Sequence, residues 1–96
     1  MEIRYTPYVD VNGTFLAAHL PDKVNRAALL RRFGETPRVG CVDPEKGYDG
    51  EEWTFRADTG DVFNVYARWG QYRIGARTEN VEAFRSWLLG ELGTVG

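Results

Sequence analysis

The chain has 96 residues, of which 27% are charged, and its formal net charge is −2. This length makes one domain, residues 1–96, and excludes a second. Because nucleic-acid-binding domains normally carry a basic surplus, the charge disfavours a general nucleic-acid binder. Aromatic residues make up 14% of the chain, and their large buried areas can build a small core, which excludes a disordered chain.

The sequence also indicates a compartment. No apolar run is long enough to cross a bilayer, and residues 1–4 do not open a signal peptide. Cys41 is the only cysteine, so no internal disulfide is possible. We therefore expect a cytoplasmic protein in a reducing environment, with no membrane partner.

The first predicted element is a β-hairpin over residues 3–20. Asn12-Gly13 is a strong signal for a two-residue hairpin turn. Such a turn pairs Val11 with Thr14. Pro7 interrupts the first strand, which marks that strand as an edge strand or a broken one.

A short helix is predicted next, over residues 26–33. Asn25 suits its N-cap, and Gly34 suits the left-handed position that ends it. Three apolar residues lie toward one side of this helix and are expected to face the core: Leu29, Leu30 and Phe33.

Residues 35–50 show neither helical nor strand periodicity and are predicted to form a long loop. Loops of this length in compact domains are usually functional or mobile. With the two residues that follow, the segment carries six acidic residues against Arg38 and Lys46. The acidic residues that we single out as candidates for binding a basic partner are Asp43, Glu45, Asp49, Glu51 and Glu52. The alternative is a solvated acidic loop without a role, since the spacing matches no calcium loop.

Three strands that alternate apolar and polar residues are predicted between residues 52 and 77. A three-residue loop at residues 58–60 joins the first two strands, pairs Phe55 with Phe63, and places Gly60 where the hairpin needs a left-handed residue. Directly paired residues share a face, so this register collects the apolar side chains on one side.

The second hairpin is predicted to turn at Gly70-Gln71, which pairs Trp69 with Tyr72 and keeps both on the apolar face. The same register places Arg68 opposite Arg73. The polar face then presents a candidate anion-binding group: Arg56, Tyr66, Arg68, Arg73 and Arg77. The alternatives are that nearby acids neutralise this group, or that the N-terminal hairpin covers part of it.

A terminal helix is predicted after a cap at Thr78 or Asn80. Its apolar stripe is formed by Val81, Phe84, Leu88 and Leu92, and this stripe is expected to cover the apolar face of the meander. The sequence therefore predicts an α+β fold, in which an antiparallel β-sheet carries two helices packed on one face.

Catalytic groups are sparse. His19 and Cys41 are single residues of their kinds, and nothing in their spacing favours a nucleophilic pair. Ser86, the only serine, is expected on the outer side of the last helix. The glycines do not cluster into a phosphate loop or a dinucleotide fingerprint. We therefore expect no enzymatic activity, no cofactor and no metal ion.

Four segments carry a resemblance to a known group: residues 33–37, FGETP, residues 53–55, WTF, residues 62–66, VFNVY, and residues 72–75, YRIG. In this order they resemble small, mostly uncharacterised proteins encoded by phages and prophages. The resemblance covers residues 24–92, and it implies a helix, a Trp/Tyr-rich meander and a closing helix. It also implies a product of a phage gene that works inside a bacterial cell. The sequence departs from the group at Arg73, where a histidine is expected, and in the tightness of its second turn.

Two functions remain open at this stage. One is a non-enzymatic binding protein that contacts a host enzyme or defence complex and acts as an inhibitor. The alternative is a small regulator that binds nucleic acid or an anionic ligand through the arginine-bearing face. The oligomeric state and the identity of the partner are not specified by the sequence.

Overall fold

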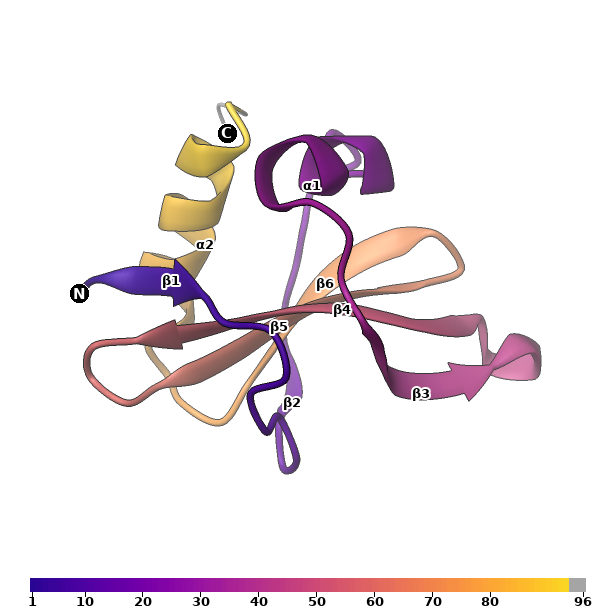
Figure 1. Cartoon of the computed structure of the whole chain (residues 1–96), viewed down its shortest axis with the longest axis horizontal. Coiled ribbons are helices and arrows are strands. Elements are labelled where there is room, and N and C mark those ends of the chain that lie inside the picture. Colours follow the sequence, from indigo (N-terminus) through magenta and orange to yellow (C-terminus); the bar gives the residue numbers. More distant parts are fainter. Residues whose placement is uncertain (94–96) are drawn as a thin grey trace.

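Six antiparallel strands and two α-helices build residues 1–93, the part of the chain that the computed structural model describes (Figure 1). The strands are β1 (Ile3–Tyr5), β2 (Phe15–His19), β3 (Arg38–Asp43), β4 (Tyr48–Ala57), β5 (Val62–Arg68) and β6 (Gln71–Ala76), and the helices are α1 (Arg26–Phe33), the short 3-10 helix η1 (Pro44–Lys46) and α2 (Val81–Glu91). The strand order is β1-β4-β5-β6-β2, and β3 also pairs with β4. Both α-helices lie on one face of the sheet, which confirms the predicted α+β class.

The core lies between this face and the two helices. Its centre is aromatic: Phe63 and Phe84 stack with ring centroids 4.3 Å apart, and Phe55 packs 5.2 Å from Phe84. Trp53 is fully buried, and its indole N–H donates to the carbonyl of Gly34, 3.0 Å away. A few large rings thus supply the buried area that a short chain needs. Within residues 1–93 no helix has the length and apolar character needed to span a membrane.

Helix α1 has the predicted bounds and caps. The Asn25 side chain accepts a hydrogen bond from the amide of Ala28, and the amide of Gly34 donates to the carbonyl of Leu30. These bonds satisfy donors and acceptors that a short helix otherwise leaves open. An ion pair between Arg26 and Glu51, 2.9 Å apart, attaches the start of the helix to β4.

The hairpin of β4 and β5 confirms the predicted register. Phe55 pairs with Phe63 and Trp53 pairs with Val65. The connecting loop closes with a hydrogen bond from the amide of Gly60 to the carbonyl of Ala57, and Gly60 has the expected left-handed φ of 89°.

The predicted register of the second hairpin is wrong by two residues. The central residues of the turn are Trp69 and Gly70, with φ of 54° and 78°. Consequently Ala67, not Trp69, pairs with Tyr72. A shift by two keeps the alternation of faces, so β6 still buries its apolar residues. Trp69 itself leaves the core and is 68% exposed.

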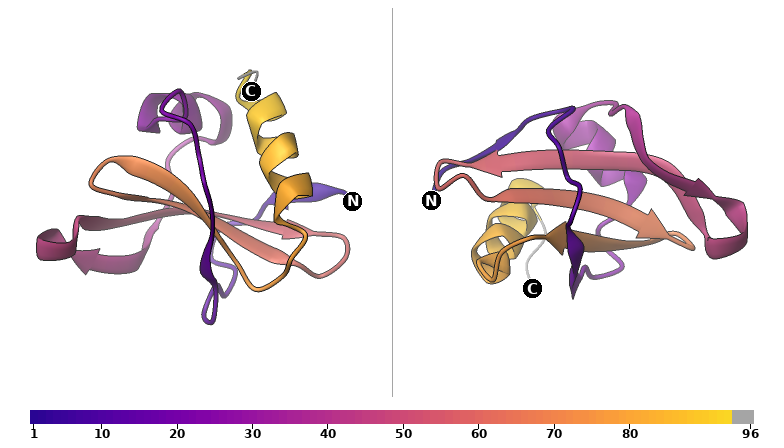
Figure 2. Two further views of the ribbon diagram at one scale, coloured as in Figure 1. Left: turned by 180° about the vertical axis from the view of Figure 1, so that it is seen from behind. Right: turned by 90° about the horizontal axis from the view of Figure 1, so that it is seen from below.

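The predicted N-terminal hairpin is also wrong. A turn does form there, because the amide of Thr14 donates to the carbonyl of Val11, but β1 and β2 do not pair with each other. They lie at opposite ends of the strand order, β1 on β4 and β2 on β6. Residues 6–14, here called the crossing segment, connect them across the face of the sheet opposite the helices (Figure 2).

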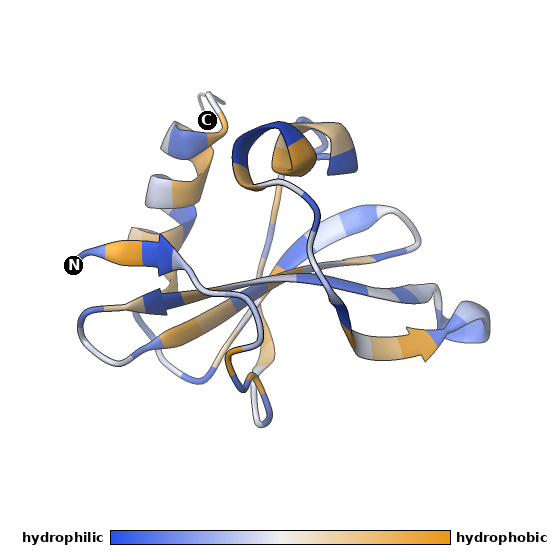
Figure 3. Ribbon diagram, in the orientation of Figure 1, coloured by the Kyte–Doolittle hydropathy of each residue, from blue (hydrophilic) through white to orange (hydrophobic). Residues whose placement is uncertain are grey.

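The predicted long loop is instead a hairpin. Strands β3 and β4 pair around a tip formed by η1 and Gly47, which has a left-handed φ of 81°. The prediction failed because β3 is an exposed edge strand, so its sequence lacks the alternation of a half-buried strand. Figure 3 shows the apolar end of this strand at the edge of the molecule.

Candidate functional site

The sheet face opposite the helices, here called the open face, presents side chains in ordered cross-strand rows. One row runs through Glu52, Tyr66, Arg73 and His19, on β4, β5, β6 and β2. The neighbouring row runs through Thr54, Asn64, Gly75 and Leu16. The crossing segment covers one end of this face, where Thr54 donates its hydroxyl to the carbonyl of Thr6, 2.6 Å away, and is only 1% exposed.

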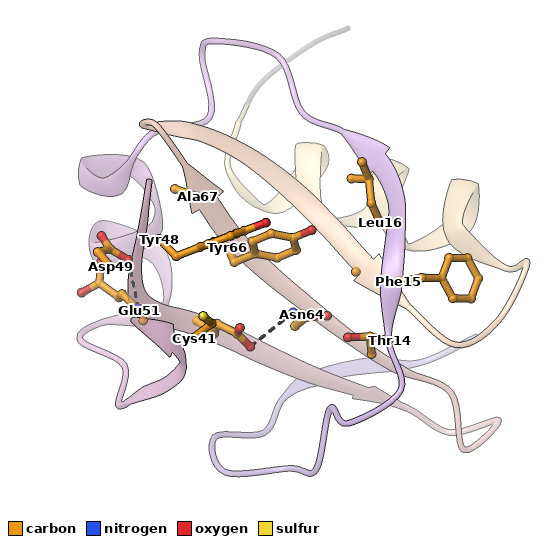
Figure 4. A pocket seen from close by; sticks show the side chains of 13 residues that line it. Thr14, Phe15, Leu16, Cys41, Tyr48, Asp49, Glu51, Asn64, Tyr66 and Ala67 are labelled. Carbon is orange, nitrogen blue, oxygen red and sulfur yellow. Dashed lines mark hydrogen bonds between the residues drawn. The ribbon is translucent and has the colours of Figure 1, made fainter. Parts of the chain in front are cut away.

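The uncovered part of the open face holds a pocket of about 190 Å³ between β2 and the β3–β4 hairpin. Among its lining residues, Tyr48 and Tyr66 lie side by side in Figure 4, with ring centroids 6.2 Å apart. Asn64 lies below them, and Leu16 and Thr14 border the other side. The pocket thus combines two aromatic rings, an amide and an apolar border.

Asn64 and Glu52 form the polar floor of the pocket. The Asn64 side-chain Nδ2 donates to Glu52 Oε2, 3.2 Å away. Asn64 is 3% exposed, yet its Oδ1 has no hydrogen-bond partner within residues 1–93. A buried acceptor without a partner is costly, and beside a pocket either a water molecule or a bound group can supply the missing donor.

The carboxyl of Glu52 is half-buried and has no basic partner. It takes part in none of the ion pairs formed within residues 1–93. Burial raises the pKa of this carboxyl above its ordinary value, and the hydrogen bond from Asn64 only partly offsets the effect. Burial also raises the pKa of the neighbouring Tyr66, although Arg73 and Arg68 act in the opposite direction.

Two glycines make room for this floor. A side chain on Gly40, in β3, would come within 2.7 Å of Glu52 Cδ. A side chain on Gly75, in β6, would come within 3.1 Å of Asn64 Cγ and closer still to its Oδ1. Both positions therefore require glycine as long as the two polar side chains keep their places.

The five acidic residues singled out from the sequence divide between the tip of the β3–β4 hairpin and the pocket of the open face. Asp43 caps η1 through a bond from the amide of Lys46, and Glu45 is exposed at the hairpin tip. Asp49 and Glu51 act on the helix side of β4, where burial and then their carboxylates raise the pKa of Tyr72 to about 12. Asp49, Glu51 and Glu52 all line the pocket of the open face, and Glu52 is the one that bonds to Asn64.

The predicted arginine group is only partly assembled. Arg68 pairs with Gln71, and Tyr66, not Arg68, pairs with Arg73, so the predicted arginine pair does not exist. Arg68 donates to the carbonyl of Lys46 and lies over the ring of Tyr48, 5.4 Å from its centroid. The other two arginines lie elsewhere: Arg77 donates to the carbonyl of Asp10, and Arg56 pairs with Arg4 across β1.

The N-terminal part of the chain covers part of the polar face, as one of the alternatives above stated. The covering element is the crossing segment and not a hairpin.

Cys41 and His19 lie on β3 and β2, at opposite edges of the sheet. No group of three or more potential metal ligands occurs within the described part of the chain.

Sequence reasoning missed Asn64, Tyr48 and Gly75 as site residues. The signal that could have found Asn64 is a polar residue in the middle of an otherwise apolar strand, with a glycine as cross-strand neighbour. That neighbour was assigned incorrectly because the predicted turn lay one residue too far along the chain, which shifts the pairing by two residues.

In comparisons with known proteins, no family model matches the chain and no solved structure matches it significantly.

Proposed function

We propose that the chain is a non-catalytic binding protein that contacts another protein through the sheet side of the molecule. One observation carries the proposal. Within residues 1–93, the non-glycine residues with positive φ are Tyr8, at 67°, and Trp69, at 54°. Both are aromatic, and they are 75% and 68% exposed.

This combination is unfavourable in water, although the amide and ring of Trp69 are held against Gly47 of the neighbouring hairpin. The left-handed conformation costs a residue with a side chain about 1–2 kcal/mol, and large exposed rings gain little from water. Strained residues of this kind concentrate at functional sites. Tyrosine and tryptophan are also the residues that most often dominate the energy of protein interfaces.

The surrounding exposed apolar residues support the same surface. The large hydrophobic residues that are exposed within residues 1–93 are Met1, Tyr8, Phe15, Leu16, Val39, Val42 and Trp69. None of them lies on α1 or α2. Exposed apolar residues can mark interaction surfaces; here Leu16 borders the pocket of the open face, Val39 and Val42 lie on β3, and Trp69 lies in the β5–β6 turn.

On the resemblance described above, we take the partner to be a bacterial host protein, an enzyme or defence complex, which the chain inhibits by binding in the cytoplasm. The proposed contact is wider than the acidic loop expected from the sequence, because only three of its acidic residues, Asp49, Glu51 and Glu52, line one pocket. Occlusion of a partner requires no catalytic group in the binder.

The experiment is capture of partners from bacterial lysate by immobilised wild type and variants. Asparagine tolerates positive φ, so Tyr8→Asn and Trp69→Asn remove the rings without straining the turns. We expect both variants to lose the captured protein. The matched control is Arg31→Asn, on the exposed side of α1, which should capture as wild type does. Capture that is equal in all four proteins would overturn the proposal.

A second candidate, binding of an anionic ligand or nucleic acid, is favoured by one observation. The Nε of Arg73 is buried without a hydrogen-bond partner, next to Tyr66. Binding of a single-stranded oligonucleotide that weakens steeply with salt, and that is lost in Arg73→Gln, would support this candidate over the first.

A further inference from the structure

The pocket on the open face differs in chemistry from the apolar residues around it. Its lining includes three acidic residues, Asp49, Glu51 and Glu52, and no lysine, arginine or histidine. Glu51 is already paired with Arg26, and Figure 4 shows Asp49 and Glu51 at the margin, away from Asn64. Glu52 is therefore the acidic group that can meet a ligand at the floor.

The arginines of this face do not neutralise Glu52. Arg73 and Arg68 both act on the pKa of Tyr66, but the causes that act on Glu52 are burial and the Asn64 hydrogen bond alone. Arg73 lies two strands away from Glu52, with Tyr66 between them, which separates their backbones by about 10 Å. A half-buried carboxylate without a counter-ion is unfavourable until a cation supplies the missing charge.

The floor offers oxygen atoms to a ligand that brings hydrogen-bond donors. Asn64 Oδ1 is a buried acceptor without a partner, and the Glu52 carboxylate beside it accepts as well. The walls are the tyrosine rings, whose faces attract cations. The protein already uses this contact once, because Arg68 lies over the ring of Tyr48.

We propose that this pocket receives an arginine side chain of the protein partner, with the guanidinium held by Glu52 and Asn64 Oδ1 beside Tyr66. Arginine suits the pocket better than lysine. Its guanidinium is planar, presents several donors in one fork and is weakly hydrated, so it can lie on an aromatic ring and bond two oxygens together. The inference rests on the proposed function, since it names the group that the bound protein inserts.

The probe for this inference is N-acetyl-arginine-amide, titrated into the isotope-labelled chain and followed by NMR. We expect saturable shifts of the Asn64 side-chain amide and of Tyr66. The neutral analogue N-acetyl-norleucine-amide should cause none of these shifts. Glu52→Gln keeps the shape and the acceptor for Asn64 Nδ2, and should weaken binding at least about tenfold because a charge-assisted bond is lost. Glu82→Gln, an equal change of charge on the exposed side of α2, should bind as wild type does.

A second readout is the pH dependence of binding, which is measured first on the wild-type chain. The affinity for the arginine probe should increase as the pH is raised from 4.5, the ordinary pKa of the group, because the carboxylate is the binding form. The other charged or titratable groups around Glu52 are Asp49, Glu51, Tyr48, Tyr66 and Cys41, which line the same pocket, and Arg68, Arg73 and, at the end of the same row, His19. His19→Gln should retain the pH dependence, and Glu52→Gln should abolish it.

The inference is overturned if norleucine binds as well as arginine, or if Glu52→Gln and Glu82→Gln have equal affinities. It is also overturned if an oligonucleotide shifts the NMR signals of Arg68 and Arg73 while the arginine probe shifts no signal. These outcomes are separable from the proposed function. Failure of the arginine probe with Trp69-dependent capture intact removes only the pocket ligand. Capture that does not depend on Trp69 removes the proposed function even if arginine binds.

Discussion

Replacing Gly75 by alanine tests the floor of the open face and the register of β5 and β6 together. Gly75 pairs with Asn64, and the added Cβ would lie 3.1 Å from Asn64 Cγ and 3.2 Å from its Nδ2. Asn64 is buried, so its side chain has to move and its bond to Glu52 breaks.

The expected cost follows from three contributions. Overpacking a tight site costs about 1–3 kcal/mol, and loss of the hydrogen bond costs about 1 kcal/mol. In the opposite direction, replacing a strand glycine by alanine stabilises the folded state by about 0.5–1 kcal/mol, because alanine loses less conformational entropy on folding. The net loss is about 2 kcal/mol in the free energy of unfolding, which lowers the melting temperature of a domain of this size by about 10 °C.

The assay is urea and thermal unfolding, followed by tryptophan fluorescence, to which the buried Trp53 contributes. The matched control is Gly90→Ala in α2, where a Cβ would meet nothing within 4 Å. It should stabilise the protein by about 0.4–1 kcal/mol. In the double variant Gly75→Ala, Asn64→Ala, the penalty of the glycine substitution should largely disappear, because the clashing side chain is gone. A Gly75→Ala protein that is as stable as wild type would refute the packing and the register.

Three further predictions concern other residues. Because the pKa of Glu52 is raised in the folded state, the native protein holds this proton more tightly than the unfolded chain, and stability falls as the pH rises through the folded pKa. Glu52→Gln should therefore melt higher than wild type at neutral pH, and the difference should vanish in melts recorded as the pH falls to 4.5. Trp69→Asn should leave the midpoint of urea unfolding unchanged or raised, because asparagine suits its φ of 54°. Phe84→Ala should cost about 3–5 kcal/mol in the same assay, since its ring is fully buried against Phe63 and Phe55.

Local signals in the sequence predicted the local structure. The caps of α1 and the loop at residues 58–60 depend on residues next to one another, and both have the expected form. The apolar face of the meander was also predicted, because alternation determines which side chains share a face whatever the exact pairing.

Features that depend on distant contacts were not predictable in this way. The turn at residues 12–13 exists, but the partners of β1 and β2 are set by β4 and β6. The turn rule placed glycine first in the second hairpin, whereas the chain holds Trp69 in the left-handed position ahead of Gly70. In this conformation the Trp69 ring packs over Gly47, which belongs to another hairpin. Such a contact between distant residues could not be predicted from the local sequence.

The candidate site was also predicted only in part. Tyr66 and Arg73 are neighbours, as adjacent strands of a meander allow. Glu52 was grouped with Asp49 and Glu51, which line the same pocket, but also with Asp43 and Glu45, which lie at the hairpin tip. The β4–β5 register that places Asn64 near Glu52 was predicted correctly, whereas the β5–β6 register that places Asn64 opposite Gly75 was not.

The central claim is that this protein binds another protein through the surface that carries Tyr8 and Trp69. Hydrogen–deuterium exchange of the chain, alone and in complex with the captured partner, tests it most directly. The account predicts slower exchange in residues 6–16 and 66–73 on complex formation, with unchanged exchange in α1 and α2. Slower exchange confined to the two helices would contradict it.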